Sequence, residues 1–204
     1  MKKTMMKSIL AAAMLVGTVV GQGGVSDAAG ATTSAPTATK APVMTDNLSK
    51  YGLKKAMNLP VTLESEGLSY TLHKIMIYDF KSAEVKKLQK LYGFQDFTGS
   101  VGSPKYFIWT KITLENNTNN TMHGGGNDIQ KLIPYTFQYK KIVDPIWPKV
   151  FASKTNSKEA LWTYTLKPGE KITSYLAYAY AGEFDFFVIR MFYGKSPIEK
   201  YVVQ

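Results

Sequence analysis

The chain has 204 residues, no cysteine and a formal net charge of +10. Without cysteine it can form neither a disulfide bond nor a lipid-anchored thiol, so an exported form would be held together by its core alone. Arg190 is the one arginine among 25 basic residues, whereas sequence-specific recognition of nucleic acid favours the bidentate arginine side chain. The composition therefore argues against a nucleic-acid partner. A diffuse lysine surface fits attraction to an anionic polymer outside the cell, and it equally fits a solubilising role.

The N-terminus predicts an export signal. Lysines precede an apolar stretch at residues 9–20, and Ser26-Asp27-Ala28 places small residues at the positions that a signal peptidase reads. We expect residues 1–28 to be a signal peptide, and the protein to be secreted or extracellular, with association to the cell wall as a further expectation. The apolar stretch is shorter than the roughly 20 residues of a spanning helix, so we expect no transmembrane segment in the mature protein. Three lysines and one aspartate leave with the signal, so the mature charge is 10 − 2 = +8.

The next segment is predicted to be a linker. Residues 29–47 are rich in Ala, Thr, Ser and Pro and contain almost no large apolar side chains, so burial cannot offset the entropy of ordering them. We expect a disordered linker there, followed by one folded domain over residues 48–204. A weak amphipathic pattern at residues 48–57 predicts a helical turn or two against this domain.

A hairpin and one short helix are expected next. Residues 60–64 and 68–80 alternate in polarity around Ser65-Glu66-Gly67, which predicts two strands joined by a tight turn. From Ser82, a typical N-cap, the apolar residues recur with the period of a helix, and Gly93 is a typical stop. The opposite face of this helix carries a basic surface, which is more typical of a solvated face than of a binding site: Lys86, Lys87 and Lys90.

The clearest strand is the run YFIWTKITLE at residues 106–115, in which aromatic and β-branched residues alternate before an Asn-rich reversal at 116–120. A flexible glycine-rich loop is expected at 122–128. Residues 129–139 predict a further strand, limited by Pro134 to an edge or a bulge. Two X-Pro pairs between residues 144 and 148 predict a break in regular structure.

Two strands are predicted to meet across the turn Lys167-Pro168-Gly169-Glu170, within residues 161–180. The last predicted strand, residues 184–193, is apolar on both faces. Such a strand is either buried on both sides or presents one side to a partner.

About seven strands with one helical insertion predict an all-β protein, an immunoglobulin-like two-sheet β-sandwich with one short inserted helix. The strand at 106–117, the sequence LKPGE at 166–170 and the closing GEFDF at 182–186 resemble the DUF4352 family of exported immunoglobulin-like domains from Gram-positive bacteria, with an MPT63-like fold. The resemblance covers roughly residues 58–203. It implies export and a binding or surface role without catalytic residues. The inserted helix and the missing lipobox cysteine depart from the family pattern.

Catalytic motifs are absent from the sequence, and no G-x-S-x-G, S-x-x-K or H-E-x-x-H occurs. Neither His73 nor His123 has further ligands at zinc spacing, so we expect no enzyme, no cofactor and no metal. Two alternatives stay open. Met122-His123 could offer sulfur and imidazole to copper, and a secreted hydrolase with an unrecognised site would need a cleft, for example one lined by His73 or Asp79.

Aromatic residues are the most prominent surplus. Tyr or Phe rings that are not needed for the core could contact a protein or stack on sugar rings. The candidate binding residues lie mainly in the C-terminal strands, and a sandwich core is the alternative explanation for them: Phe184, Phe186, Phe192, Tyr178, Tyr180 and Trp109.

The function expected from the sequence is a non-catalytic binding or adhesion domain at or near a bacterial cell surface. Its partner would be an extracellular protein or an anionic cell-wall polymer, and a homodimer through the aromatic strands is a further prediction.

Overall fold

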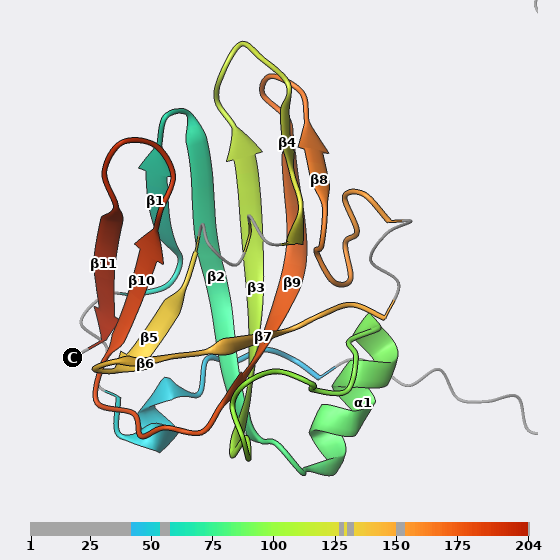
Figure 1. Cartoon of the computed structure of the whole chain (residues 1–204), viewed down its shortest axis with the longest axis vertical. Helices are drawn as coiled ribbons and strands as arrows, with labels where there is room; N and C mark the ends of the chain where they lie inside the picture. Colours follow the sequence, from blue (N-terminus) through green and yellow to red (C-terminus); the bar gives the residue numbers. More distant parts are fainter. Residues whose placement is uncertain (1–41, 54–57, 127–128, 130–132, 150–153, 204) are drawn as a thin grey trace, which may run out of the picture. The chain divides into compact units, whose positions relative to one another are not determined.

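The computed structural model describes residues 42–53, 58–126, 129, 133–149 and 154–203. The predicted signal peptide and most of the predicted linker lie outside the described residues. None of the helices in the described part of the chain is long and apolar enough to cross a bilayer. Figure 1 labels the strands and α1. The described elements are, in chain order, η1 (Leu48–Tyr51), β1 (Val61–Ser65), β2 (Leu68–Asp79), α1 (Ala83–Tyr92), β3 (Tyr106–Asn116), β4 (Met122–Gly124), β5 (Tyr135–Gln138), β6 (Lys141–Ile142), β7 (Asp144–Ile146), β8 (Tyr164–Leu166), β9 (Lys171–Tyr180), β10 (Phe187–Met191) and β11 (Ile198–Val203).

The described residues form a β-sandwich that carries the short helix α1, which confirms the predicted fold. The first sheet has the strand order β1-β2-β3-β9-β7, and the second sheet has the order β11-β10-β5-β6. Strands β4 and β8 form a separate two-stranded ribbon. The main core lies between the sheets, and it receives side chains from β1, β2, β3, β9, β5 and β10.

Strand β3 is central in the first sheet because it pairs antiparallel with β2 along one edge and with β9 along the other. Alternation along the strand sends Ile108 and Ile112 into the main core and Phe107 and Trp109 to the outer face of the sheet. Both sets are buried. The outer face of this sheet therefore needs a cover over part of its length.

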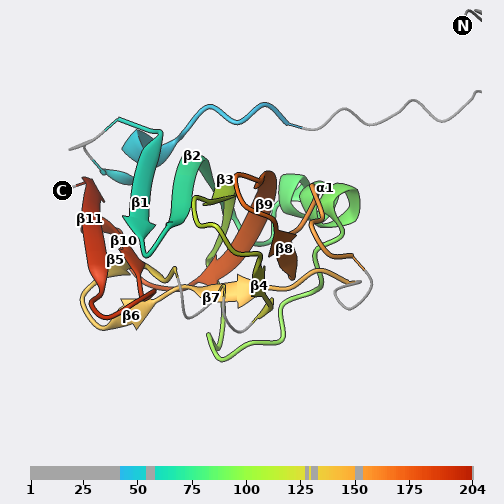
Figure 2. The same ribbon diagram turned by 90° about the horizontal axis from the view of Figure 1, so that it is seen from above.

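Helix α1 supplies that cover, with Ser82 as N-cap and Gly93 as C-cap, as predicted. Figure 2 shows α1 beside β3 and β9, away from β10, β5 and β6. Its buried residues Val85 and Leu88 form a second apolar cluster with side chains of the outer face. The small side chains of Ala177 and Ala179 on β9 allow the helix layer to approach this part of the sheet closely.

Several predicted connections are wrong in detail. The strands on either side of the 167–170 turn do not pair with each other, because β8 pairs with β4 instead. Part of the predicted glycine-rich loop forms β4. The predicted break contains β7, which tolerates Pro145 because β7 is an edge strand of three residues. The predicted strand at 129–139 begins only after Pro134, as β5.

Residues 42–47, which the sequence assigns to the linker, lie against the edge of β2. Beyond Leu72 this edge has no pairing to β1. Asp46 Oδ1 accepts the Ile75 N–H at 2.8 Å, and Asn47 Oδ1 accepts the Ile77 N–H at 2.7 Å. Asn47 Nδ2 donates to the Ile77 carbonyl at 2.7 Å. Two side chains thus take the place of a neighbouring strand.

Candidate functional site

Three of the aromatic candidates are buried, so the prediction that they contact a partner is wrong for them. Trp109, Tyr178 and Tyr180 are 1%, 5% and 1% exposed. The ring of Trp109 stacks on Tyr175 at a centroid distance of 5.0 Å in the layer beneath α1. Tyr178 and Tyr180 belong to the main core. Both faces of β9 are buried at residues 176–180, which explains why this part of the strand is apolar on both faces.

The phenylalanines of the C-terminal strands divide into covered and open positions. Phe184 packs against the main core, and its ring lies 5.1 Å from that of Tyr51 in the η1 segment. Phe186 is half-buried, with its ring 6.4 Å from Tyr201. Phe192 is 50% exposed. Among the described residues, the exposed rings at the second sheet are Tyr139, Phe192 and Tyr201, and Phe184 and Phe186 are not among them.

The predicted copper pair does not converge. Met122 and His123 are consecutive residues of β4, so their side chains leave the strand on opposite faces. Met122 packs against the main core, whereas His123 is exposed and its Nδ1 lies 2.9 Å from Thr165 Oγ1. Within the described residues, no group of three or more His, Asp or Glu side chains could hold a metal ion.

The outer face of the first sheet has a polar half that α1 does not cover. A row of threonines crosses four strands there, because the strand registers place Thr62 opposite Thr71, Thr71 opposite Thr113, and Thr113 opposite Thr173. Thr62 and Thr71 hydroxyls lie 2.8 Å apart, and those of Thr113 and Thr173 lie 2.7 Å apart. The sequence offers no sign of this row, since it appears only once the registers are known.

His73 extends this row at an irregularity of β2, where the register shifts between Leu72 and Lys74. Its Nε2 lies 2.8 Å from Thr113 Oγ1. Burial lowers the pKa of His73, and the nearby Lys111 ammonium lowers this pKa further. A hollow of about 330 Å³ opens beside the imidazole, and it is lined by Leu59, Pro60, His73, Lys74, Lys111 and Thr173.

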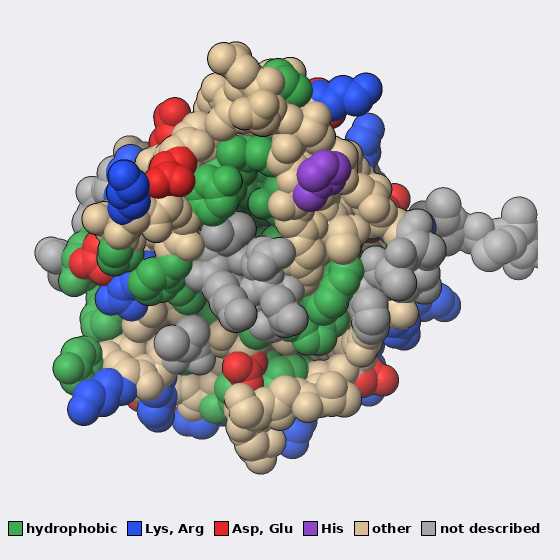
Figure 3. Space-filling view, turned by 45° about the horizontal axis from the view of Figure 1, so that its top comes forward, with side chains coloured by type: hydrophobic (Ala, Val, Ile, Leu, Met, Phe, Trp, Pro, Cys, Tyr) green, Lys and Arg blue, Asp and Glu red, His purple; other side chains and the backbone are tan. Residues whose placement is uncertain are grey.

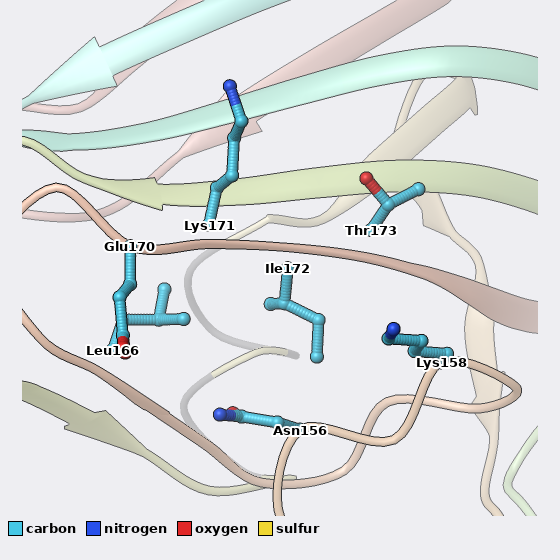
Figure 4. A pocket seen from close by; sticks show the side chains of 7 residues that line it. All are labelled: Asn156, Lys158, Leu166, Glu170, Lys171, Ile172 and Thr173. Atoms are coloured by element: carbon cyan, nitrogen blue, oxygen red, sulfur yellow. The ribbon is translucent and has the colours of Figure 1, made fainter. Parts of the chain in front are cut away.

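A second hollow, of about 570 Å³, adjoins the first at Thr173. It lies between β9 and the loop that contains Asn156 and Lys158 (Figure 4). In this view Ile172 points into the hollow, whereas Lys171 and Thr173 point to the other side of the strand. The first hollow is an open groove on the polar half of the outer face, and the second hollow opens at the edge of β9, on the side of the strand to which Ile172 points.

Basic side chains gather on this side of the domain. Lys111 and Lys171 lie on the outer face of the sheet, and Lys74 is paired with Asp46 at 2.7 Å. The basic surface predicted on α1 is exposed and lies over the other half of the same face: Lys86, Lys87 and Lys90. In the face drawn in Figure 3, Lys and Arg side chains are scattered around the margin with acidic side chains between them.

The fold and this groove define the molecule as a β-sandwich domain with an open, hydroxyl-rich and lysine-bearing face. No protein-family model and no curated protein matches the chain. The resemblance to DUF4352 therefore stays a prediction.

Solved structures from Gram-positive bacteria share similarity with the chain. The yjhA protein from Bacillus subtilis matches with a TM-score of 0.40 and 12% identity over 64% of this chain and 76% of that one. The ycdA protein from Bacillus subtilis matches with a TM-score of 0.45 and 8% identity over 72% of this chain and 39% of that one. A functionally unknown protein from Listeria monocytogenes matches with a TM-score of 0.42 and 11% identity over 71% and 80%. Likenesses at this level give no function.

Proposed function

We propose that the protein is a non-catalytic binding domain of the DUF4352 type, secreted to the surface of a Gram-positive cell, and that its outer face binds an anionic, hydroxylated polymer of the cell wall. One observation carries the proposal: lysines of the groove and of α1 lie on one side of the domain, around a row of threonine hydroxyls. Lysine ammonium groups attract phosphate or carboxylate groups, and hydroxyls exchange hydrogen bonds with a polyol or sugar.

The absence of a strong ion-pair network supports this assignment of the basic face. Among the described residues, Lys111, Lys171 and the α1 lysines form no salt bridge within 4.0 Å, so their charges stay available to a ligand. The net charge of the secreted form, 10 − 2 = +8, would add long-range attraction. Because exposed charges act through water, binding should weaken steeply as salt rises toward molar concentrations, where the screening length is about 3 Å.

The test is binding to polyphosphate, a simple soluble polyanion, by the variant Lys86→Gln/Lys87→Gln/Lys90→Gln. If each lysine contributes about 1 kcal/mol, as near an anionic membrane, the triple variant should bind on the order of 100-fold more weakly. The matched control removes the same charge from exposed lysines at the second sheet: Lys140→Gln/Lys141→Gln/Lys195→Gln. Equal weakening in both variants would show that only net charge matters, and would contradict a binding face.

A hydrolase is the second candidate, because His73 Nε2 lies 2.8 Å from a threonine hydroxyl beside a hollow. A hydroxyl next to an imidazole is the beginning of a nucleophile–base pair. Thr113 is only 9% exposed, and its hydroxyl also contacts Thr173. Hydrolysis of wall fragments that His73→Ala abolishes would favour the enzyme over the binding domain.

A further inference from the structure

At the beginning of β9, one stretch of strand edge has no paired strand among the described residues. Strand β7 pairs with Ala177 and Ala179 of β9, and the Leu161 N–H donates to the Tyr175 carbonyl at 3.1 Å. Backbone groups of alternate residues in a strand face the same edge, so those of Lys171 and Thr173 face the same way as those of Tyr175. Among the described residues, no hydrogen bond reaches these outward groups of Lys171 or Thr173.

Two other strand edges of this domain are closed by side chains. Asp46 and Asn47 close the edge of β2 at Ile75 and Ile77. On β8, Asn156 Oδ1 accepts the Thr165 N–H at 2.9 Å, and Asn156 Nδ2 donates to the Thr165 carbonyl at 2.8 Å. Asn156 therefore lines the hollow but is occupied with β8. The edge of β9 across the same hollow is left open, although open edges are an aggregation hazard that native proteins usually avoid.

The hollow beside this edge has the chemistry of a strand-addition site. Ile172 and Leu166 line it with apolar surface, and Lys158 and Lys171 provide positive charge. The one acidic residue that lines it, Glu170, already accepts the Lys167 N–H at 2.9 Å. An added strand would find backbone partners at the edge, an apolar contact at Ile172 and lysines beside it.

We propose that the open edge of β9 at residues 171–173 binds an extended peptide segment of another protein, in which acidic and apolar side chains alternate. The acidic side chains pair with Lys158 and Lys171, and an apolar side chain lies against Ile172. A second copy of this chain fits less well, because two β9 edges placed side by side would bring equal charges at Lys171 together. This site goes beyond the polymer-binding face and needs none of the α1 lysines.

The experiment measures binding of a fluorescent hexapeptide of alternating Glu and Val to the full protein by anisotropy. Thr173→Pro removes an outward N–H without removing a bond to β3, whereas Thr173→Ala keeps this N–H and loses only the hydroxyl. We expect saturable binding that Thr173→Pro weakens by about tenfold or more, and that Thr173→Ala changes by less than roughly threefold. The corresponding Lys-Val hexapeptide should bind much more weakly.

Each other outcome overturns the inference. The inference is refuted if the protein does not bind the Glu-Val peptide saturably. It is also refuted if the Thr173→Pro and Thr173→Ala variants bind the peptide equally well. Self-association of the protein that Thr173→Pro abolishes would make the occupant a second copy. If circular dichroism shows that Thr173→Pro does not fold, the double variant Lys158→Glu/Lys171→Glu provides the test. This variant should bind the Lys-Val peptide more tightly than the Glu-Val peptide. An unchanged preference for the Glu-Val peptide refutes the proposal. The variant Lys86→Gln/Lys87→Gln/Lys90→Gln, whose residues do not line this hollow, should still bind the Glu-Val peptide saturably, so the two proposals fail separately.

Discussion

Three tyrosines of the main core place their hydroxyl groups next to one another and away from water. Tyr70 and Tyr135 are hydrogen-bonded through their hydroxyls, and Tyr178 and Thr110 are further neighbours of the Tyr135 hydroxyl. Burial raises the pKa of Tyr135 to about 12 and raises the pKa of Tyr70 and Tyr178 well above their usual value. A buried hydroxyl needs a partner, so this cluster places polar atoms in the core at a cost that mutual bonding offsets.

Alkaline titration tests this cluster. A tyrosine whose folded pKa exceeds the unfolded value of about 10 contributes stability that is present below pH 10 and is lost as pH rises through the folded pKa. We expect the free energy of unfolding to fall between pH 10 and about 12, with ionisation of the buried tyrosines coinciding with unfolding. Ultraviolet absorbance and circular dichroism at each pH measure both events. Ionisation of all tyrosines near pH 10 in the folded protein would contradict the burial.

Substitution separates the roles of the two bonded tyrosines. Tyr135→Phe leaves the Tyr70 hydroxyl buried without its partner, which should cost about 1–3 kcal/mol of unfolding free energy. Tyr70→Phe should cost less, because the Tyr135 hydroxyl keeps Thr110 and Tyr178 as neighbours. Denaturant unfolding of both variants gives the comparison. A greater cost for Tyr70→Phe would show that Tyr135 does not hold the cluster together.

His73 reports on the charge in the groove. Because burial and Lys111 lower its pKa, His73 contributes stability that is present above its unfolded pKa of about 6.5 and is lost as pH falls through the folded pKa. Lys111→Gln should raise the pKa of His73, and Lys195→Gln on the other sheet should not. Proton NMR titration of the imidazole measures this. An unchanged pKa in Lys111→Gln would mean that the ammonium group does not act on the imidazole.

At the scale of elements, α1 packs against one half of the outer face of the first sheet. Leu88 is fully buried in the second apolar cluster, whereas Leu91 on the same helix is 38% exposed. Leu88→Ala should cost about 2–5 kcal/mol of unfolding free energy through the cavity it leaves. Leu91→Ala should change the free energy of unfolding by no more than about 0.5 kcal/mol. Urea unfolding of both variants tests whether α1 is a structural layer, and similar small losses would show that the helix is only loosely attached.

Element types were predictable where the signal is local. The hairpin of β1 and β2 and both caps of α1 follow from residues within a few positions of each element, such as Gly93 with its positive φ of 68°. Pairing partners were not predictable. The turn at 167–170 would ordinarily join two paired strands, but β8 pairs with β4 and not with β9. Pro145 predicted a break, yet an edge strand needs no N–H at that position.

The candidate site could hardly be predicted from the sequence, because it too depends on which strands pair. Thr62, Thr71, Thr113 and Thr173 are far apart along the chain, and only the strand registers align them. The aromatic residues, by contrast, predicted a binding surface that the structure does not show at Trp109, Tyr178 and Tyr180. They are buried because this part of the sheet packs against other layers on both faces. Trp109 is thus explained by the helix layer rather than by a partner.

At the scale of the whole domain, the start of the folded unit lies before the position that composition predicts. Compositional bias marks residues 42–47 as linker, but the contacts of Asp46 and Asn47 replace a strand at the edge of β2. Asp46 also pairs with Lys74, and its side chain is only 4% exposed. Polar side chains of a low-complexity segment therefore complete the sheet, although they bury little apolar surface.

The last prediction follows from this edge closure. Asn47→Ala in the full protein leaves the Ile77 N–H without its side-chain partner, and an unpaired buried group costs about 1–3 kcal/mol, whereas the Ile77 carbonyl loses the Asn47 bond and keeps the bond from the Tyr51 hydroxyl at 3.0 Å. Asn47→Asp keeps the acceptor for the N–H and loses only the bond to the carbonyl, so it should destabilise less. Thermal unfolding of the parent and both variants should therefore rank the parent first and alanine last. Equal melting of all three would place residues 42–47 outside the folded unit, as their composition predicts.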